Sequence, residues 1–305
     1  MSAGVTVAVA VVVRDRCAPM QRCLDALVSQ TLQPDQLIVI DNGSTDGTVE
    51  MLRARGVDVV VQLGSLGLAR QRAVDLCTSE LLAWTDSDCR PTPTWLERLV
   101  AAAAPDVAVV QGRTVAEQAP RPRWSRTLEI DHWSDLYECC NLLYRVDVLR
   151  AAGGFDTSIG FFGEDTAPGW RIRRTHGPGV FAGDAVVEHA VTNPGLSWHL
   201  RRGLRYSVWP RLVREFPEMR EVVMHHRVFL NRHRPPVALA VAGVLAAVGT
   251  GKATPLLAVL PWLHHRRPSR PGLDGALDSF AGIAFDAAVT AGLVAGAVKE
   301  RRVVL

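Results

Sequence analysis

The sequence lacks the phosphate-binding motifs of several large enzyme classes. No Gly-x-Gly-x-x-Gly follows a strand-like run, and no Gly-Lys-Ser/Thr closes a glycine-rich loop. The first absence argues against a dinucleotide-dependent dehydrogenase, and the second argues against a P-loop ATPase. A nucleotidyltransferase on a similar sheet is also disfavoured, because no glycine-rich loop with Lys or Arg follows the first strand-like run.

Metal-binding and disulfide patterns are missing as well. The six cysteines include no Cys-x-x-Cys pair and no spacing to histidine that suits a tetrahedral zinc site. We interpret them as the reduced cysteines of a cytosolic protein. A strand-like run begins at Val5, without the basic start and small-residue cleavage site of a signal peptide. We therefore expect the catalytic part to stay in the cytoplasm.

A strong charge of one sign is absent too. The chain has 34 basic and 31 acidic residues, a formal net charge of +3, which is too small to predict a nucleic-acid partner. With 305 residues it can bury one large α/β core and a smaller appendage without disulfides or metals. One catalytic domain with an extension is the expected organisation.

Strand-like and helix-like segments alternate along the first part of the chain. Val5–Val13 is a continuous apolar run typical of a strand buried on both faces, and a helical spacing of apolar residues follows it from Met20 to Val28. Further strands are expected at 37–40, 57–62 and 81–85, with one helix that begins near 44–48 and another around 69–77. This β-α-β-α order predicts a doubly wound sheet that binds its ligand at the carboxyl ends of the strands.

Two acidic loops follow strands of this predicted sheet. Asp41-Asn42-Gly43 comes after the second strand, and Asp86-Ser87-Asp88 comes after the strand at 81–85. An extended Asp-Ser-Asp directs both carboxylates to one side, and hard cations such as Mg²⁺ or Mn²⁺ prefer such oxygens when they bridge to a substrate phosphate. The same tripeptide is also common in turns and helix caps, so both interpretations stay open here.

A third acidic pair, Glu164-Asp165, precedes a probable helix that contains Trp170 and Ile172. Acidic residues at a helix start often do no more than cap it. The functional alternative is a general base that takes the proton of an acceptor hydroxyl. The spacing by itself favours the cap.

The last third of the chain changes in character. Residues 198–234 hold much of the Arg and His, and between 198 and 214 the arginines interleave with Trp and Leu. This pattern suits a basic amphipathic element on an anionic membrane surface, and a solvated helix face with a packed underside is the alternative. Residues 236–262 and 280–298 are largely apolar, but Gly and Pro interrupt the first run and Arg flanks it on both sides. Basic residues at both ends favour two half-helices that enter and leave a membrane on one side, or that lie in its interface. A buried helical subdomain is the alternative.

Several short motifs together resemble a family 2 glycosyltransferase with the GT-A fold. They occur in the family's order and cover roughly residues 5–190. The motifs are Val-Ile-Asp-Asn-Gly-Ser-Thr-Asp-Gly-Thr (39–48), Gly-Leu-Ala-Arg-Gln-Arg-Ala (67–73), Trp-Thr-Asp-Ser-Asp (84–88), Pro-Thr-Trp-Leu (93–96), Gly-Gly-Phe-Asp (153–156) and Gly-Glu-Asp-Thr (163–166).

The resemblance implies a GT-A type doubly wound mixed sheet flanked by helices, with a helical, membrane-associated C-terminal extension. The expected domains are a nucleotide-sugar transferase domain (1–195), basic connecting helices (196–235) and an apolar helical extension (236–305). The enzyme would lie at the cytoplasmic face of the cell membrane, with a peripheral or re-entrant anchor. Its acceptor would be a glycan, a lipid-linked molecule or a small molecule.

The resemblance also implies roles for the residues that bind the donor. Asp41 and Asn42 would approach the nucleotide base, and Arg70 would lie near the phosphate or ribose of the nucleotide-diphosphate sugar. Asp86 would face the ribose, while Asp88 would hold Mn²⁺ or Mg²⁺ on the diphosphate. Together these residues form the expected donor site.

Three more residues would complete the site. By resemblance Asp165 is the base of an inverting displacement, with Glu164 next to it in the acceptor region. His189, in Val-Val-Glu-His-Ala, is placed like a histidine that some relatives have near the metal, although a hydrogen-bonded structural histidine is the alternative. A protein that binds nucleotide sugars or acts as a scaffold, with the same fold and no catalysis, is the competing functional class.

Overall fold

The central sheet is built around a strand of small and β-branched residues. The computed structural model places β1 at Val7–Val13, where only Val12 is half-buried and the other side chains are buried. β1 pairs in parallel with β2 (Gln36–Asp41) on one side and with β4 (Leu81–Thr85) on the other. Helices therefore have to cover both faces of this part of the sheet, as expected for buried parallel strands.

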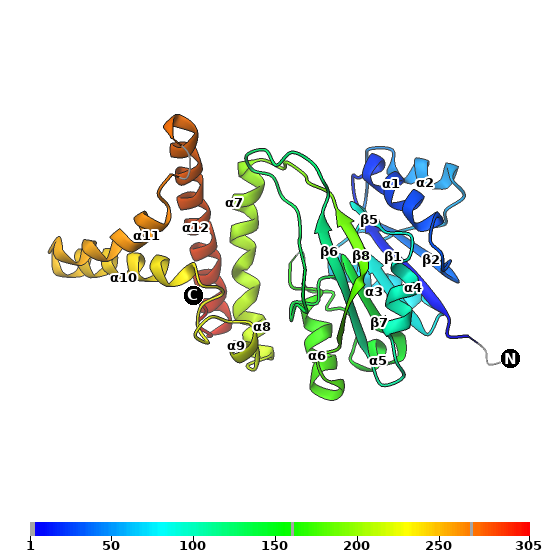
Figure 1. Ribbon diagram of the computed structural model, residues 1–305. Helices are drawn as coiled ribbons and strands as arrows, with labels where there is room; N and C mark the ends of the chain where they lie inside the picture. The colour runs from blue at the N-terminus through cyan, green and yellow to red at the C-terminus, as the bar shows by residue number, and fades with distance from the viewer. Residues whose placement is uncertain (1–3, 160–161, 269–270) are drawn as a thin grey trace. The chain divides into compact units, whose positions relative to one another are not determined.

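The complete sheet has eight strands in the order β3-β2-β1-β4-β7-β6-β8-β5. β7 is antiparallel to both of its neighbours, β4 and β6, whereas β6 and β8 are parallel. This mixed, helix-flanked sheet confirms the predicted GT-A type fold (Figure 1). The remaining strands are β3 (Val59–Val61), β5 (Cys89–Pro91), β6 (Val109–Ala116), β7 (Asn141–Arg145) and β8 (Val180–His189).

The helices next to the sheet bury the faces that their apolar spacing predicts. In α1 (Cys17–Val28) the buried side chains include Met20, Cys23, Leu24 and Leu27. α2 begins only at Thr48, because Gly47 before it has a left-handed backbone with φ 85°. The other helices here are α2 (Thr48–Ala54), α3 (Leu66–Leu76), α4 (Trp95–Ala102), α5 (Val146–Ala151) and α6 (Thr166–His176).

The structure describes residues 4–159, 162–268 and 271–305. These fall into two compact units. The sheet unit comprises residues up to 121 together with 126–192, and the helical unit comprises 122–125 together with 193–305. The helical unit contains α7 (Leu196–Leu204), η1 (Arg205–Val208), α8 (Trp209–Glu215), α9 (Met219–Val222), α10 (Arg234–Thr250), η2 (Thr254–Val259), α11 (Leu260–His265) and α12 (Gly272–Glu300).

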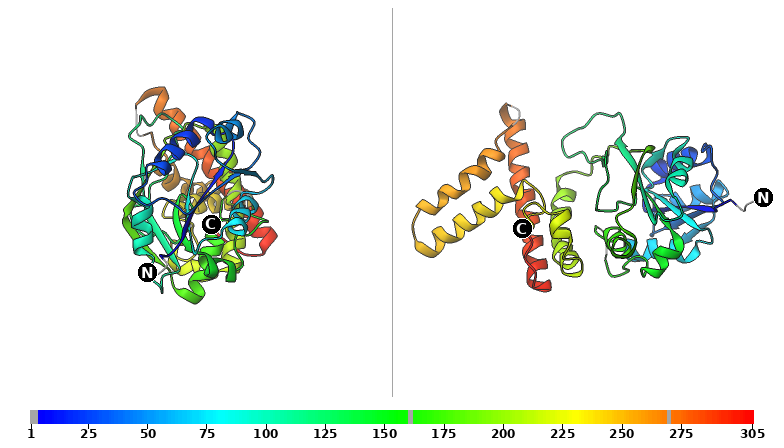
Figure 2. Two further views of the ribbon diagram at one scale, coloured as in Figure 1. Left: turned by 90° about the vertical axis from the view of Figure 1, so that its right-hand side faces the viewer. Right: turned by 60° about the horizontal axis from the view of Figure 1, so that its bottom comes forward.

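Within the helical unit, α10 and the η2–α11 segment form a hairpin. α10 ends at Gly251, whose left-handed φ of 66° reverses the chain. The returning arm packs so closely that a Cβ at Gly243 would lie 2.6 Å from the Pro255 carbonyl oxygen. Figure 2 shows the two arms side by side. Their outer side chains, among them Leu245 (67% exposed) and Leu257 (65%), are apolar and uncovered within this unit.

α12 packs against α7, η1 and α8 through small residues. A Cβ at Gly292 would lie 2.6 Å from the Leu204 carbonyl oxygen, and a Cβ at Gly296 would lie 2.3 Å from the Ser207 carbonyl oxygen. Among the described residues, α12 is the single helix whose length and composition would allow it to cross a membrane. A third of its most apolar stretch (33%) is buried inside the protein.

Candidate active site

The Asp-Ser-Asp loop lies at the carboxyl end of β4, where the sequence places it. Asp88 is nearly buried, with 10% of its side chain exposed, and Asp86 is 36% exposed. β5 begins directly after Asp88 and pairs with the end of β8, so that Cys89 lies opposite His189. This pairing brings the end of β8 to the acidic loop, about 100 residues away in the sequence.

His189 is buried and has its two ring nitrogens in different surroundings. Nδ1 lies 3.0 Å from the Ala190 carbonyl oxygen, to which it donates. Nε2 is buried, lacks a hydrogen-bond partner among the described residues, and lies 3.8 Å from Asp88 Oδ1. An imidazole that donates one ring N–H to a carbonyl and directs its other nitrogen toward the site has the usual arrangement of a metal-ligating histidine.

These side chains form a cluster that fits a divalent cation. One ligand atom each from Asp86, Asp88, Cys89 and His189 lies within 4.8 Å of the others. Burial raises the pKa of the Cys89 thiol well above its usual value, and the negative charges of Asp86 and Asp88 add to this effect. A protonated thiol is a poor ligand, so two carboxylates and one imidazole remain as the donor set, which suits Mn²⁺ or Mg²⁺.

Arg70 joins the two acidic motifs. It lies on α3, is 5% exposed, and its Nη1 is 2.5 Å from Glu164 Oε1. The same guanidinium is 3.7 Å from Asp86 Oδ1 and 3.7 Å from Asp165 Oδ2. One buried cation therefore contacts the carboxylate after β4 and the two carboxylates before α6.

Asp165 occupies the N-cap position of α6, but it does not act as a cap. Its side chain accepts no capping hydrogen bond from the described helix. Burial raises the pKa of Asp165, while Arg70 opposes this shift. Burial and the charge of Asp165 also raise the pKa of Glu164, to about 7. A carboxyl group whose pKa is shifted toward neutrality is suited to proton transfer at physiological pH.

Asp41 and Asn42 lie at the end of β2. Asp41 Oδ1 accepts hydrogen bonds from the backbone N–H groups of Gly43 and Ser44, both at 2.9 Å. Asp41 Oδ2 is buried and lacks a partner in the described part of the chain, so it can accept from a ligand. The amide of Asn42 is engaged on both sides with the backbone of Gly64, at 3.2 Å each, and holds this loop in place.

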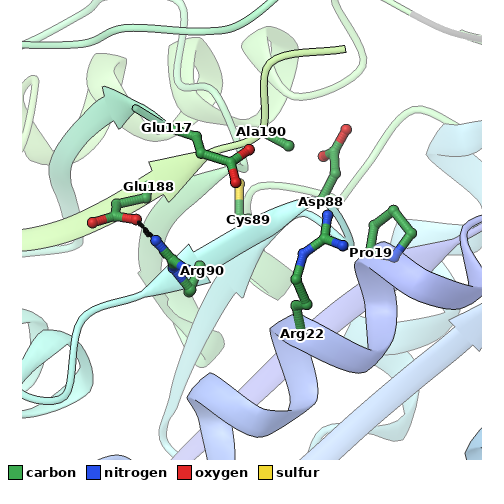
Figure 3. A pocket seen from close by; sticks show the side chains of 8 residues that line it. All are labelled: Pro19, Arg22, Asp88, Cys89, Arg90, Glu117, Glu188 and Ala190. Atoms are coloured by element: carbon green, nitrogen blue, oxygen red, sulfur yellow. Dashed lines mark hydrogen bonds and ion pairs between the residues drawn. The ribbon is translucent and has the colours of Figure 1, made fainter. Parts of the chain in front are cut away.

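The structure adds residues that the sequence analysis does not name. Arg16, at the end of β1, has Nη2 3.9 Å from Asp88 Oδ2, and the rule that strand ends carry ligand-binding residues could have found it. Arg22, on α1, lines a small cavity of about 20 Å³ together with Asp88 (Figure 3). Burial and the nearby Asp165 raise the pKa of Glu138 to about 7. Glu138 lies in a loop and follows no motif that would have marked it.

Sequence comparison places the sheet unit in a known family. Residues 8–154 match the glycosyl transferase family 2 profile. Glycosyltransferase AglE of Haloferax volcanii is 28% identical over 173 residues, which cover 50% of this chain and 57% of that protein. Glycosyltransferase YibD of Escherichia coli is 30% identical over 90 residues, 28% of this chain and 26% of that protein. The aligned segments thus span well under two thirds of either relative.

Solved structures agree with this fold. A mannosyltransferase from Pyrobaculum calidifontis, in complex with GDP-Man and Mn²⁺, superposes with a TM-score of 0.58 at 19% identity and covers 98% of this chain and 88% of its own. Glucosyl-3-phosphoglycerate synthase from Mycobacterium tuberculosis, in complex with Mn²⁺ and UDP-glucose, gives 0.52 at 19% identity over 69% and 78%. The fold of this chain is thus the GT-A fold of these glycosyltransferases. Residues 8–154 of the sheet unit match the glycosyl transferase family 2 profile, and the relatives that align there are glycosyltransferases.

Proposed function

We propose that the chain is an inverting, divalent-metal-dependent glycosyltransferase that moves a sugar from a nucleotide-diphosphate donor to an acceptor hydroxyl. The observation that carries this proposal is the arrangement around Arg70. Its guanidinium contacts both Asp86, in the candidate metal cluster, and Asp165, the candidate base. The donor phosphates and the acceptor hydroxyl would thus bind next to each other, on either side of the Arg70 contacts.

In the proposed reaction Asp165 takes the proton of the acceptor hydroxyl. The acceptor oxygen forms a bond to the anomeric carbon as the bond from that carbon to the diphosphate oxygen breaks. The electron pair leaves with the nucleoside diphosphate, and the configuration at the anomeric carbon is inverted. Burial raises the pKa of Asp165, which makes it a stronger base than an exposed Asp and favours this step.

The donor end of the site is proposed to consist of Asp41, Arg70, Asp86, Asp88 and His189. A cation held by Asp86, Asp88 and His189 would supply positive charge next to the departing diphosphate. Asp41 Oδ2 lacks a partner among the described residues, which supports a role as acceptor from the base of the nucleotide, and Asn42 holds the loop that carries it. The nucleotide sugars in the two solved neighbours support this class of donor.

The acceptor is proposed to be lipid-linked or close to a membrane, with the enzyme at the cytoplasmic face. This part rests on the helical unit, whose hairpin exposes apolar side chains along α10 and η2. Arg232 precedes the hairpin and Arg266 and Arg267 end it. A hairpin with apolar arms and arginines at its open end is typical of a segment that inserts into a membrane from one side.

Replacing Asp165 with Asn tests the base. The full chain is assayed with labelled UDP-, GDP- and dTDP-sugars in the presence of Mn²⁺, and donor binding is followed by thermal shift. We expect Asp165→Asn to retain donor-induced stabilisation while transfer and donor hydrolysis fall by at least about a hundredfold, the usual order for loss of a general base.

Asp147→Asn, at an exposed acidic residue on α5, is the matched control and should leave turnover unchanged. Unchanged turnover in Asp165→Asn would refute the base assignment. A wild-type chain that binds a donor but neither transfers nor hydrolyses it with any acceptor would instead support the non-catalytic binding protein.

A further inference from the structure

The helical unit contains a cavity that the proposed reaction does not use. It has a volume of about 240 Å³, room for roughly eight water molecules at about 30 Å³ each. Two arginines and two histidines line it, and the single acidic residue in its wall is Asp286. The complete lining is Tyr206, Asn231, His233, Arg234, His265, Arg266, Phe285, Asp286 and Val289.

The Asp286 carboxylate forms hydrogen bonds with only one of the two arginines, because both of its oxygens accept from Arg266. Arg266 Nη2 donates to Oδ1 at 2.6 Å, and Arg266 Nε donates to Oδ2 at 2.8 Å. The indole Nε1 of Trp262 donates to Oδ2 as well, at 2.8 Å. The bidentate pair with Arg266 and the bond from Trp262 thus use the well-aligned lone pairs of the Asp286 carboxylate.

Arg234 is left with little to bind. It is 6% exposed, and its Nη1 is 3.7 Å from Asp286 Oδ1, beyond hydrogen-bond distance. Nη2 donates to Thr290 Oγ1 at 2.8 Å, whereas Nε and Nη1 are buried and have no hydrogen-bond acceptor among the described residues. A buried guanidinium with unmet donors is costly unless an acceptor reaches it.

Two imidazoles lie at the same place, and Arg232 Nε donates to His233 Nε2 at 3.5 Å, so the free imidazole donor is on His265. His233 Nδ1 and His265 Nε2 are 3.1 Å apart, and the rings stack. Burial lowers the pKa of His233, and the charges of His265, Arg232 and Arg266 lower it further. α10 also begins here, with Arg234 at its first position, so its positive dipole end adds to the field of the cavity.

We propose that this cavity binds a phosphate group through Arg234 and His265, with His233 holding the His265 ring in place. A phosphate offers several acceptor oxygens to guanidinium and imidazole donors at once, which a single carboxylate already held by Arg266 cannot do. The ligand is a phosphate monoester or diester, supplied either as the headgroup of an anionic lipid or as a soluble phosphate. The cavity lies where both arms of the apolar hairpin begin and end, which is the headgroup level of any membrane that the arms enter.

The test measures binding alone, so its result is independent of transferase activity. Full-length protein in detergent is titrated with inorganic phosphate by calorimetry, and separately sedimented with phosphatidylcholine vesicles with and without phosphatidic acid. We expect His265→Gln and Arg234→Lys each to weaken phosphate affinity by about tenfold, as loss of a charge-assisted hydrogen bond implies.

His264→Gln and Arg267→Gln are the matched controls, because these exposed neighbours do not line the cavity. They should bind phosphate like the wild type. A response to inorganic phosphate but not to phosphatidic acid identifies a soluble ligand, and the reverse identifies a lipid headgroup.

Two results would overturn the proposal. One is a wild-type protein that neither binds phosphate nor prefers phosphatidic acid vesicles. The other is a loss of binding in the controls that equals the loss in His265→Gln. If Arg234→Lys lowers the thermal midpoint, the phosphate affinity of His265→Gln still tests the proposal, because His265 is exposed.

Discussion

At the residue scale, His189 differs from an ordinary buried histidine in how its ring nitrogens are used. Nδ1 is bound to a backbone carbonyl next to it in the chain, whereas Nε2 faces Asp88 without a hydrogen bond among the described residues. Leaving an acceptor nitrogen buried and unmet costs free energy. A bound cation would remove this cost, and this is the physical reason to expect His189 in the metal site.

Replacing His189 with Gln should therefore weaken metal activation. We expect the Mn²⁺ concentration for half-maximal activity to rise by about 10- to 100-fold, because metal sites commonly lose this much when a supporting group is removed. The measurement is a titration of metal-stripped protein with Mn²⁺, read as transfer rate and as thermal stabilisation. Cys89→Ser is the control, since a protonated thiol contributes little, and an equal loss there would contradict the assignment.

Arg70 is the residue on which the acidic site depends for its charge balance. Its side chain is 6% exposed and that of Glu164 is 4% exposed, so solvent screens their pairing very little. Asp86 and Asp165 share the same cation. Removing it leaves several carboxylates close together in a poorly hydrated site.

Arg70→Met should lower the free energy of unfolding by about 3–5 kcal/mol, the usual cost of breaking a buried pair from one side. The double variant Arg70→Met/Glu164→Gln should recover part of that loss, because the buried charge it removes is the one left unpaired. Chemical denaturation of the four variants of this cycle gives the coupling energy. If the losses in unfolding free energy of the two single variants add up in the double variant, Arg70 and Glu164 are not energetically coupled.

Single residues of the site differ in how far the sequence could predict them. Asp86 and Asp88 follow a buried strand, so their position at its carboxyl end could be read from the order of elements. The joining role of Arg70 could not, because it depends on the side chain of α3 meeting a loop 94 residues later. The surroundings of Asp165 were also beyond sequence reasoning, since spacing favours a cap and only the fold shows that the capping bond is not made.

At the element scale, the hairpin of the helical unit is held together by close contact between its arms. Gly243 faces the Pro255 carbonyl oxygen and the Ala258 side chain, whereas Gly249, on the same helix, faces open space. Substitution of Gly243 therefore tests packing between the arms, whereas substitution of Gly249 tests helix propensity alone. Periodicity could predict apolar helices here, but the pairing of the arms depends on the missing side chain at one position.

Gly243→Ala should lower the thermal midpoint of the full chain in detergent. Its Cβ would lie 2.6 Å from a backbone oxygen, an overpacking that costs about 1–3 kcal/mol. Gly249→Ala should leave the midpoint unchanged or raise it, because Ala is favoured over Gly in a helix by about 1 kcal/mol. Circular dichroism melts of both variants provide the comparison. A midpoint that falls equally in both would contradict tight packing of the arms.

Among the elements of the sheet unit, most follow from local sequence. β4 occupies the expected residues, and α1 buries the expected face. β3 is shorter than expected, at Val59–Val61, because only these residues pair with β2. The antiparallel insertion of β7 between two other strands is set by long-range pairing, which no local pattern encodes.

At the scale of the whole molecule, the candidate active site and most of the exposed large apolar side chains belong to different units. The candidate active site lies in the sheet unit, while large apolar side chains are exposed along α10, η2 and α12 of the helical unit. Contiguous exposed apolar surface marks a site of membrane or protein interaction.

Charge placed on the hairpin should therefore reduce membrane association of the whole chain. Leu245→Glu, at a 67% exposed position, is expected to lower the fraction that sediments with anionic vesicles several-fold. Val28→Glu, at a 73% exposed position on α1, should have no effect. A wild-type chain that stays wholly in the supernatant would contradict membrane association through the hairpin.

The pairing of β5 with the end of β8 has a consequence for how the protein matures. Asp88 and His189 meet only when a chain segment of about 100 residues has been closed into the sheet, and such long-range pairings form late because loop entropy opposes them. High-affinity Mn²⁺ binding should accordingly be absent from nascent or partly folded forms. The metal would then stabilise only chains that have completed β8, which makes its uptake a checkpoint of folding as well as a step toward catalysis.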